Sequence, residues 1–504
     1  MFTRLTVRLA LPMVGVIVLA GAQAYAAAPD GNVVPVPSTP TTAAPYIGAP
    51  ATAQPVSGVP RTPQNHYMAP NGDSSIHNDG WQTDSYRRGG PLGVSPQKLS
   101  ASINGVCGSI GYDKRGRILS TCVGVQRALN LIDPKTLDVI DTYDLPRPPT
   151  DPSSPPGNPF QGFSGGAYFY VDHHGRAVIG DADGKFLVIK PKGEVLKLKK
   201  SFNLAPLLRQ GEVLNSGLPG SDGLLWFVTK KNGVVGTLNL RTGRTQIIRL
   251  GSGAVGQIEN SIAVGARGEA YVATNRKLYR FSHDKLGVPV VDWSIDYPSG
   301  GPVKPGQVDD GTGTTPTVLP GGYVAITDNA DPMNVVVYRT SKKRSNQNRL
   351  VCSVPVFGKG AGSTENSLIG AGRSLIVENN YGYTGPDAVA LGRTTVPGFA
   401  RVDIRKNGHG CKTVWTNDTV SAPSVVPKLS LATGLIYTYA KPAGDASDPW
   451  YWTALDYRTG KVVWQILAGA GPAYNNNYAG ISLSRDGTAY LGVIPGVIAL
   501  RDGA

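Results

Sequence analysis

The sequence predicts an all-β protein, a β-propeller of eight four-stranded blades. An apolar strand, a turn with Gly and a second apolar strand recur eight times, and the turn glycines return every 45 to 60 residues or so, which is a propeller-like period. The 64 Gly, 40 Pro and 17 % charged residues suit many short strands joined by turns. Radially packed blades bury both faces of such strands. Seven blades and two packed β-sandwiches are the alternatives.

The eight copies can be located by their turn glycines. These are Gly116, Gly175, Gly223, Gly268, Gly322, Gly372, Gly434 and Gly487. The last copy, from Ala479 to Leu500, supplies only about three strands by its length. We expect an N-terminal strand from Trp81 to Arg87 to complete this blade and close the ring, because closure removes an exposed sheet edge. The propeller domain is therefore predicted over residues 81–504.

Residues 1–26 have the pattern of a secretory signal peptide. Arg4 and Arg8 precede an apolar core at 9–20, and Ala-Tyr-Ala at 24–26 is a cleavage site. The core is short for a membrane anchor, which is the alternative, and no later segment is long and apolar enough to span a membrane. We therefore expect a secreted or periplasmic protein of the cell envelope.

Residues 27–80 form a segment rich in Pro, Ala and Thr with few apolar side chains. Such a composition predicts a flexible leader, because little surface can be buried to offset the entropy of ordering. His66, His77 and Asp79 lie in its last part, so a metal-binding tail is an alternative to an unstructured polar segment.

The chain is basic, with a formal net charge of +14 that becomes +12 once the two Arg of the signal peptide are removed. Local clusters lie at Lys190–Lys200 and Lys342–Arg349. A solvated basic surface with weak attraction for anionic cell-envelope polymers is expected. The sequence has no basic module interleaved with aromatic residues, so we predict no nucleic-acid partner.

The four cysteines of an exported chain are most simply two disulfides. Cys107 and Cys122 would bridge adjacent strands of one repeat, and Cys352 and Cys411 would bridge successive repeats. Other pairings stay open at this point. Their spacing resembles no zinc site.

The stretch from Ala454 to Trp464 reads Ala-x-Asp-x-x-Thr-Gly-Lys-x-x-Trp. It resembles the tryptophan-docking repeat of the quinoprotein-like β-propellers, in which the Trp packs between blades and the Asp and Thr close the turn. Leu238–Arg244 and Leu131–Leu137 are partial copies. The resemblance implies a secreted bacterial member of this superfamily. Its dehydrogenases carry adjacent cysteines beside pyrroloquinoline quinone, and the lack of a Cys-Cys pair argues against a quinone cofactor. Relatives that scaffold outer-membrane assembly share the repeat without a cofactor.

Loops that share one face of a propeller carry an unusual number of carboxylate and amide side chains. We expect these loops, which enter the innermost strands or follow the second strands, to form a ligand-binding face. Its candidate residues are Asn215, Asp328, Asn329, Glu378, Asn379 and Asn380.

Two similar short segments, Gln257–Ile262 and Ser363–Leu368, each place a Glu-Asn pair directly before an expected inner strand. Carboxylate and amide oxygens are the ligands that Ca²⁺ prefers. Glu259, Asn260, Glu365 and Asn366 are therefore candidate calcium ligands facing the central channel. The alternative is that these side chains satisfy backbone amides around a wet channel.

These observations leave the question of catalysis open. No motif nominates a nucleophile or a base. We predict a monomeric binding or scaffold module whose Asn/Asp/Glu-rich face takes a cell-envelope polymer, a protein or a small molecule. The alternative is a calcium-dependent hydrolase or lactonase with Ca²⁺ acting as a Lewis acid at the channel. A quinone-dependent dehydrogenase is the third hypothesis.

Overall fold

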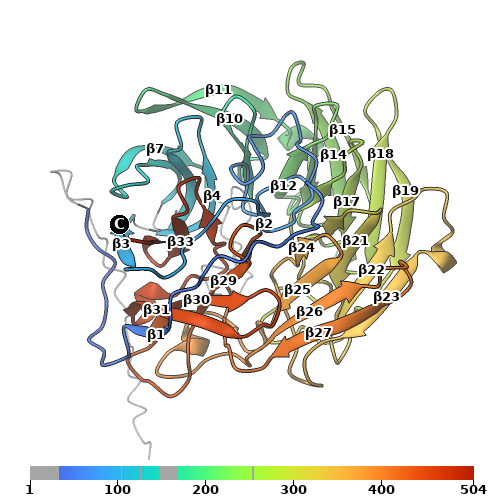
Figure 1. Cartoon of the computed structure of the whole chain (residues 1–504). Helices are drawn as coiled ribbons and strands as arrows, with labels where there is room; N and C mark the ends of the chain where they lie inside the picture. The colour runs from blue at the N-terminus through green and yellow to red at the C-terminus, as the bar shows by residue number, and fades with distance from the viewer. Residues whose placement is uncertain (1–32, 104, 125, 148–167, 252–254, 504) are drawn as a thin grey trace, which may run out of the picture.

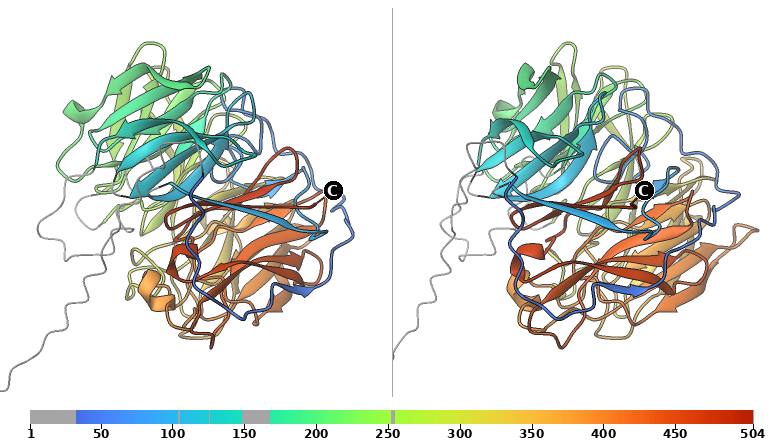
Figure 2. Two further views of the ribbon diagram at one scale, coloured as in Figure 1. Left: turned by 90° about the vertical axis from the view of Figure 1, so that its left-hand side faces the viewer. Right: turned by 60° about the vertical axis from the view of Figure 1, so that its left-hand side comes forward.

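Eight four-stranded antiparallel blades follow one another around a central axis in the computed structural model (Figures 1 and 2). The structure describes residues 33–503 except 104, 125, 148–167 and 252–254. The predicted all-β propeller is confirmed, and the blade count is eight, not seven. The predicted signal peptide, residues 1–26, lies outside the described residues.

The first four blades are built from consecutive strands, with the first strand of each nearest the axis. Blade 1 has β4 (Gly105–Tyr112), β5 (Ile118–Gly124), β6 (Arg127–Ile132) and β7 (Val139–Leu145). Blade 2 has β8 (Phe169–Val171), β9 (Ala177–Gly180), β10 (Lys185–Lys192) and β11 (Val195–Asn203). Blade 3 has β12 (Leu214–Pro219), β13 (Leu224–Thr229), β14 (Val234–Asn239) and β15 (Thr245–Arg249). Blade 4 has β16 (Ala263–Val264), β17 (Ala270–Ala273), β18 (Lys277–His283) and β19 (Pro289–Asp296).

Blades 5 to 7 repeat this order. Blade 5 has β20 (Thr317–Leu319), β21 (Tyr323–Thr327), β22 (Asn334–Arg339) and β23 (Leu350–Pro355). Blade 6 has β24 (Ile369–Ala371), β25 (Ser374–Glu378), β26 (Phe399–Ile404) and β27 (Cys411–Asn417). Blade 7 has β28 (Lys428–Ser430), β29 (Leu435–Ala440), β30 (Pro449–Asp456) and β31 (Val462–Ala470). Short 3-10 turns lie at Ala205–Leu207, Asn346–Asn348, Pro386–Val389 and Pro472–Tyr474.

An N-terminal strand closes the ring, but it is not the predicted one. Blade 8 consists of β32 (Ser482–Leu483), β33 (Ala489–Val493), β34 (Gly496–Arg501) and, outermost, β3 (Gln97–Ser102). In β3 the alternating Leu99 and Ala101 pack into the adjoining core. The expected strand over 81–87 cannot be continuous, since Gln82 and Asp84 have φ of +59° and +54°.

The segment predicted as a flexible leader has a defined path over its described part, 33–80. It contributes β1 (Tyr46–Gly48) to the outer edge of blade 7, and the chain that follows it adds β2 (Ser85–Tyr86), which pairs in parallel with β28 at the inner edge. Residues 73–75 and 77–79 are buried. The polar composition does not predict this ordered path, because the segment buries its side chains against the propeller and builds no core of its own.

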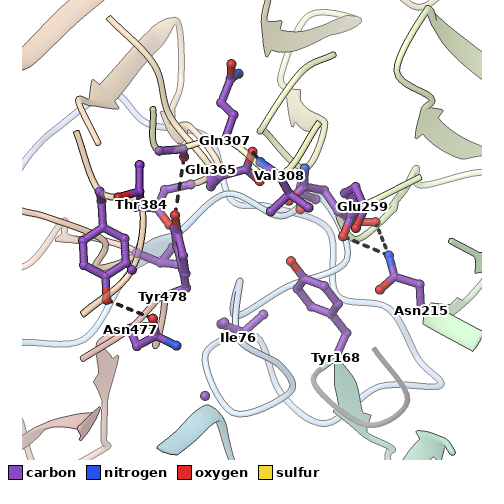
Figure 3. Close-up of a pocket in the computed structure, with 18 of the residues that line it drawn as sticks. Ile76, Tyr168, Asn215, Glu259, Gln307, Val308, Glu365, Thr384, Asn477 and Tyr478 are labelled. Carbon is purple, nitrogen blue, oxygen red and sulfur yellow. Dashed lines mark hydrogen bonds between the residues drawn. The ribbon is translucent and has the colours of Figure 1, made fainter. Parts of the chain in front are cut away.

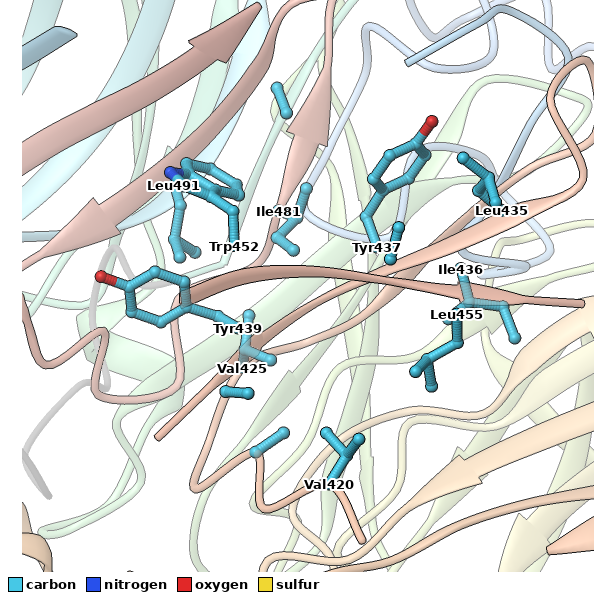
Figure 4. Close-up of a cluster of buried hydrophobic side chains, with 14 of the residues drawn as sticks. Val420, Val425, Leu435, Ile436, Tyr437, Tyr439, Trp452, Leu455, Ile481 and Leu491 are labelled. Atoms are coloured by element: carbon cyan, nitrogen blue, oxygen red, sulfur yellow. The ribbon is translucent and has the colours of Figure 1, made fainter. Parts of the chain in front are cut away.

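Both faces of a blade are covered by its neighbours, so inner strands read as continuous apolar runs. In β29 every residue is buried, and Tyr437 and Tyr439 lie among side chains such as Ile481 and Leu491 of blade 8 (Figure 4). These inter-blade layers form the core of the ring.

The turn between β30 and β31, which carries the Ala-x-Asp-x-x-Thr-Gly-Lys-x-x-Trp motif, is closed by Asp456 as the sequence predicts. Asp456 Oδ1 accepts hydrogen bonds from the backbone N–H groups of Arg458 and Thr459 at 2.9 and 2.8 Å. The Trp that packs on this turn, however, comes from blade 6: Trp415 Nε1 donates to the carbonyl of Tyr457 at 3.0 Å. Trp464 itself is fully buried beside Tyr437.

Both predicted disulfides are present in the structure. Cys107–Cys122 joins β4 to β5 within blade 1, and Cys352–Cys411 joins the outer strands of blades 5 and 6. Among the described residues, no helix has the length and apolar character needed to cross a membrane.

Candidate functional site

A cavity of about 340 Å³ lies at the axis of the ring (Figure 3). Loops that enter the inner strands supply most of its wall, from Tyr168 before blade 2 to Tyr478 before blade 8. The N-terminal segment adds Ile76 and His77. The radial arrangement thus brings together side chains from distant parts of the sequence, and the N-terminal segment forms part of the wall.

Five of the ten predicted site residues line this cavity. They are Asn215, Glu259, Asn260, Glu365 and Asn366. Asn215 Nδ2 donates to the carbonyls of Ile258 and Glu259, both at 3.0 Å, and so fixes the loop that carries Glu259. The wall therefore contains two carboxyl groups held in place by amide side chains.

The other five predicted residues lie outside the cavity lining and order its loops. Glu378 Oε1 accepts hydrogen bonds from Asn366 Nδ2 at 2.8 Å and from Asn380 Nδ2 at 2.7 Å. Asn379 Nδ2 donates to the carbonyl of Ala361 at 2.8 Å. These bonds hold the loop that carries Glu365 and Asn366.

Asp328 and Asn329 organise the neighbouring loops of blade 5. Asp328 Oδ1 accepts the backbone N–H of Asn334 at 2.8 Å, which closes the β21–β22 turn. Asn329 Nδ2 donates to the carbonyl of Asp310 at 3.0 Å. Asn329 thus supports the loop over 303–310, part of which lines the cavity, while Asp328 orders the turn that carries Asn329.

The carboxyl groups at the cavity differ in their electrostatic surroundings. Glu259 forms an ion pair with Lys230 at 2.8 Å. Burial raises the pKa of Glu365 well above its usual range, and the nearby Asp309 and Glu259 raise it further, while the hydrogen bond from Val308 opposes them. Burial also raises the pKa of Asp309 to about 7. Glu365 is therefore protonated more readily than an exposed carboxyl group.

His77 connects the cavity to a buried ionic group below it. His77 Nδ1 lies 3.1 Å from Asp84 Oδ2 and 2.7 Å from Ser367 Oγ. Asp84 in turn pairs with Lys428, and both side chains are fully buried. This Ser–His–Asp group lacks the relay geometry of a hydrolase, since one ring nitrogen faces both the hydroxyl and the carboxylate.

The four candidate calcium ligands all border the cavity, yet each has another partner. Glu259 holds Lys230, and Glu365 Oε1 accepts the N–H of Val308 at 2.8 Å. Asn366 turns its amide nitrogen toward Glu378, which leaves its Oδ1 without a hydrogen-bond partner among the described residues. Within the same part of the chain, no three His, Cys, Asp or Glu side chains gather closely enough to hold a metal ion. Calcium binding stays a prediction.

Several lining residues were not found by sequence reasoning. Tyr168, Lys230, the loop 303–308, Tyr383 and Tyr478 all border the cavity. Tyr478 follows three asparagines, Asn475 to Asn477, but a single tyrosine before an inner strand has no local pattern that separates it from a core residue. In Figure 3 the hydroxyl of Tyr168 points into the open space.

No protein-family model matches the chain. An uncharacterized protein of Archaeoglobus fulgidus is 26 % identical over 335 residues, which cover 60 % of this chain and 64 % of that protein. The chain thus spans just under two thirds of the length of this curated relative.

Solved structures similar to this chain include two named proteins. BamB from Moraxella catarrhalis has 15 % identity and a TM-score of 0.45, with 83 % of this chain and 96 % of that chain covered. Virginiamycin B lyase from Staphylococcus aureus has 12 % identity and a TM-score of 0.42, with 81 % and 98 % covered.

Proposed function

We propose that this protein is an extracytoplasmic binding propeller whose central cavity takes a small hydroxyl-bearing ligand, such as a saccharide unit of the cell envelope. The observation that carries the proposal is the axial cavity itself. Its volume of about 340 Å³ falls in the range of small-molecule sites. The two disulfides support a location outside the cytoplasm, where disulfides persist.

The chemistry of the wall supports a neutral polar ligand. The phenol rings of Tyr168 and Tyr478 offer flat apolar surface together with hydroxyl groups, whereas the hydroxyl of the buried Tyr383 already donates to Asn475 and Asn477, both at 2.9 Å. Glu259 is neutralised by Lys230, and Glu365 holds a proton more readily than an ordinary carboxyl. The wall therefore offers both donors and acceptors, as a ligand bearing several hydroxyl groups requires.

A thermal-shift screen of monosaccharides and disaccharides tests this proposal. A ligand that binds only the native state raises the melting temperature with concentration. We expect at least one saccharide to do so in the wild type and to lose the effect in Tyr478→Ala. If no saccharide shifts the melt, the proposed ligand class is wrong.

A calcium-dependent hydrolase is the second candidate, and the presence of Glu259 and Glu365 on one cavity favours it. A bound calcium ion would have to displace Lys230 from Glu259. Incubation of the same saccharides and of simple lactones with calcium or with chelator, followed by product analysis, separates the two functions. Calcium-dependent turnover that Glu365→Ala abolishes would replace the binding proposal.

A further inference from the structure

A second concave site lies on the outside of the ring, between blades 1 and 2. It is a groove of about 590 Å³ on the side of the β4–β5 and β8–β9 turns, away from the axial cavity. Cationic side chains dominate its wall. They are Lys114, Arg115, Arg117, Arg176, Lys190, Lys199 and Lys200, with His174 beside them and Asp113 as the one acidic residue of the lining.

The two turns that form one wall are built alike, and this leaves their other cations free. Asp113 binds Arg117 at 2.7 Å, and Asp172 binds Arg176 in the same way at 2.5 Å. Arg117 Nη1 also donates to the carbonyl of Gly193 at 2.6 Å, which ties the first turn to the β10–β11 hairpin. The two acidic residues are thus used to hold the turns and do not neutralise the remaining cations.

Four cations of the groove form no ion pair among the described residues: Lys114, Arg115, Lys190 and Lys199. All four are exposed. The other acidic groups nearby are Asp141, which accepts the N–H of Leu196, and the exposed Glu194. The groove therefore carries a net positive charge in the absence of a partner.

The β10–β11 hairpin of the groove also contains a repulsive pair of like charges. Lys190 on β10 lies directly opposite Lys197 on β11. Like charges in directly opposed positions of an antiparallel pair are destabilising. A bound anion would relieve this repulsion, so binding and stability are coupled at this hairpin.

We propose that this groove binds a linear anionic polymer with repeated phosphate groups and no bases. Flexible Lys side chains act as point charges and do not demand one fixed geometry, which suits a chain of repeating anions. Among the described residues that line the groove there is no Phe, Tyr or Trp on which bases could stack, so a nucleic acid is disfavoured. The site is separate from the axial cavity, and the proposal does not depend on the ligand of that cavity.

Binding of fluorescently labelled polyphosphate of fixed length, measured by anisotropy at several salt concentrations, tests the proposal. The test variant is the double change Lys190→Gln and Lys199→Gln. The control, Lys343→Gln and Lys406→Gln, makes the same change in charge at exposed lysines of blades 5 and 6. We expect the test variant to bind at least tenfold more weakly at low salt, and the control to stay within twofold of wild type.

The salt dependence gives a second readout. Each phosphate contact that is lost should lower the slope of log Kobs against log salt by about 0.7, so the test variant should lose about 1.4. Its melting temperature without polymer should equal or exceed that of the wild type, because the Lys190–Lys197 repulsion is removed. A melting temperature at or above that of the wild type would show that weaker binding does not come from unfolding of the variant.

Three further probes complete the test. Inorganic phosphate should bind far more weakly than polyphosphate, since it makes only one contact.

Equal loss of affinity in the test and control variants would show that net charge alone attracts the polymer and would overturn the proposal. Tighter binding to oligothymidylate or to phosphatidylglycerol vesicles than to polyphosphate would also overturn it, in favour of a nucleic acid or a membrane surface.

Discussion

The carboxylate of Asp84, which lies just after the N-terminal segment, accepts a hydrogen bond from the ammonium of Lys428 at the start of β28, and both side chains are 0 % exposed. Lys428 Nζ also donates to the carbonyl of Ile76. Because each charge would be costly to bury alone, the pair holds the N-terminal segment at the axis. The same segment supplies Ile76 and His77 to the cavity wall, so this ion pair positions part of the proposed binding site.

Removing one member of this pair should be more harmful than removing both. Lys428→Met leaves Asp84 buried without its cation and should lower the free energy of unfolding by about 3–5 kcal/mol. The double variant with Asp84→Asn should recover part of that loss. Denaturant unfolding of the two single variants and the double variant measures the coupling. Simple additivity of the two single losses would contradict the account.

Stability should depend on pH through Asp79. Burial raises the pKa of Asp79 to about 7, whereas the unfolded value is about 3.9. Between pH 4 and pH 7 the folded state therefore binds more protons at Asp79 than the unfolded state does. The stabilisation that Asp79 contributes is fully present below pH 4 and is lost as the pH rises through 7. Asp79→Asn should gain stability relative to wild type by about 1.4 kcal/mol per pH unit in this window.

Unfolding free energies of both proteins from pH 4 to pH 8 measure this difference. Asp183→Asn, which changes an exposed carboxylate, is the control and should show no comparable trend. A stability difference between Asp79→Asn and wild type that stays constant with pH would refute the assignment.

The disulfide between blades should make a large contribution. Cys352 and Cys411 are separated by 59 residues, and loop-closure entropy sets the upper stabilisation for such a bridge at about 4 kcal/mol. Replacing both cysteines with Ser should lower the unfolding free energy by up to this amount in chemical denaturation. Unchanged stability after the replacement would show that the bridge does not form in the protein.

The turn at Gly460 should tolerate no side chain, because it packs beneath Trp415. An added Cβ would lie 2.4 Å from Trp415 Cε3, and Gly460 has φ of +70°. Gly116 has a similar φ of +79° but open space around it, which makes Gly116→Ala a matched control for backbone strain. Gly460→Ala should cost about 1–3 kcal/mol more than Gly116→Ala in thermal or denaturant unfolding. Equal losses would mean that Trp415 does not dock there.

The sequence predicts the ring better than it predicts the site. The turn glycines of the eight repeats locate the eight blades, and the two cysteine pairs favoured by their places in the repeats, with other pairings left open, are the ones that form. The closing strand was misplaced because Leu99 and Ala101 are a short signal, while Trp81 is a conspicuous residue. Glu259 and Glu365 were identified from the sequence because each lies just before an inner strand, within two segments of similar sequence. Tyr168 and His77 were not assigned to the cavity, since their role depends on tertiary placement across the axis.

The central claim, that the axial cavity binds a small hydroxyl-bearing ligand, is tested most directly by titration calorimetry with a saccharide that shifts the melt. Tyr168→Phe removes only the hydroxyl that points into the cavity (Figure 3). Tyr67→Phe makes the same change at a half-exposed tyrosine that lies outside the cavity lining, beside His173, and serves as the control. We predict roughly tenfold weaker binding for Tyr168→Phe, as loss of one hydrogen bond implies, and unchanged binding for Tyr67→Phe. Equal affinity of wild type and Tyr168→Phe, or no saccharide that binds, would contradict the account.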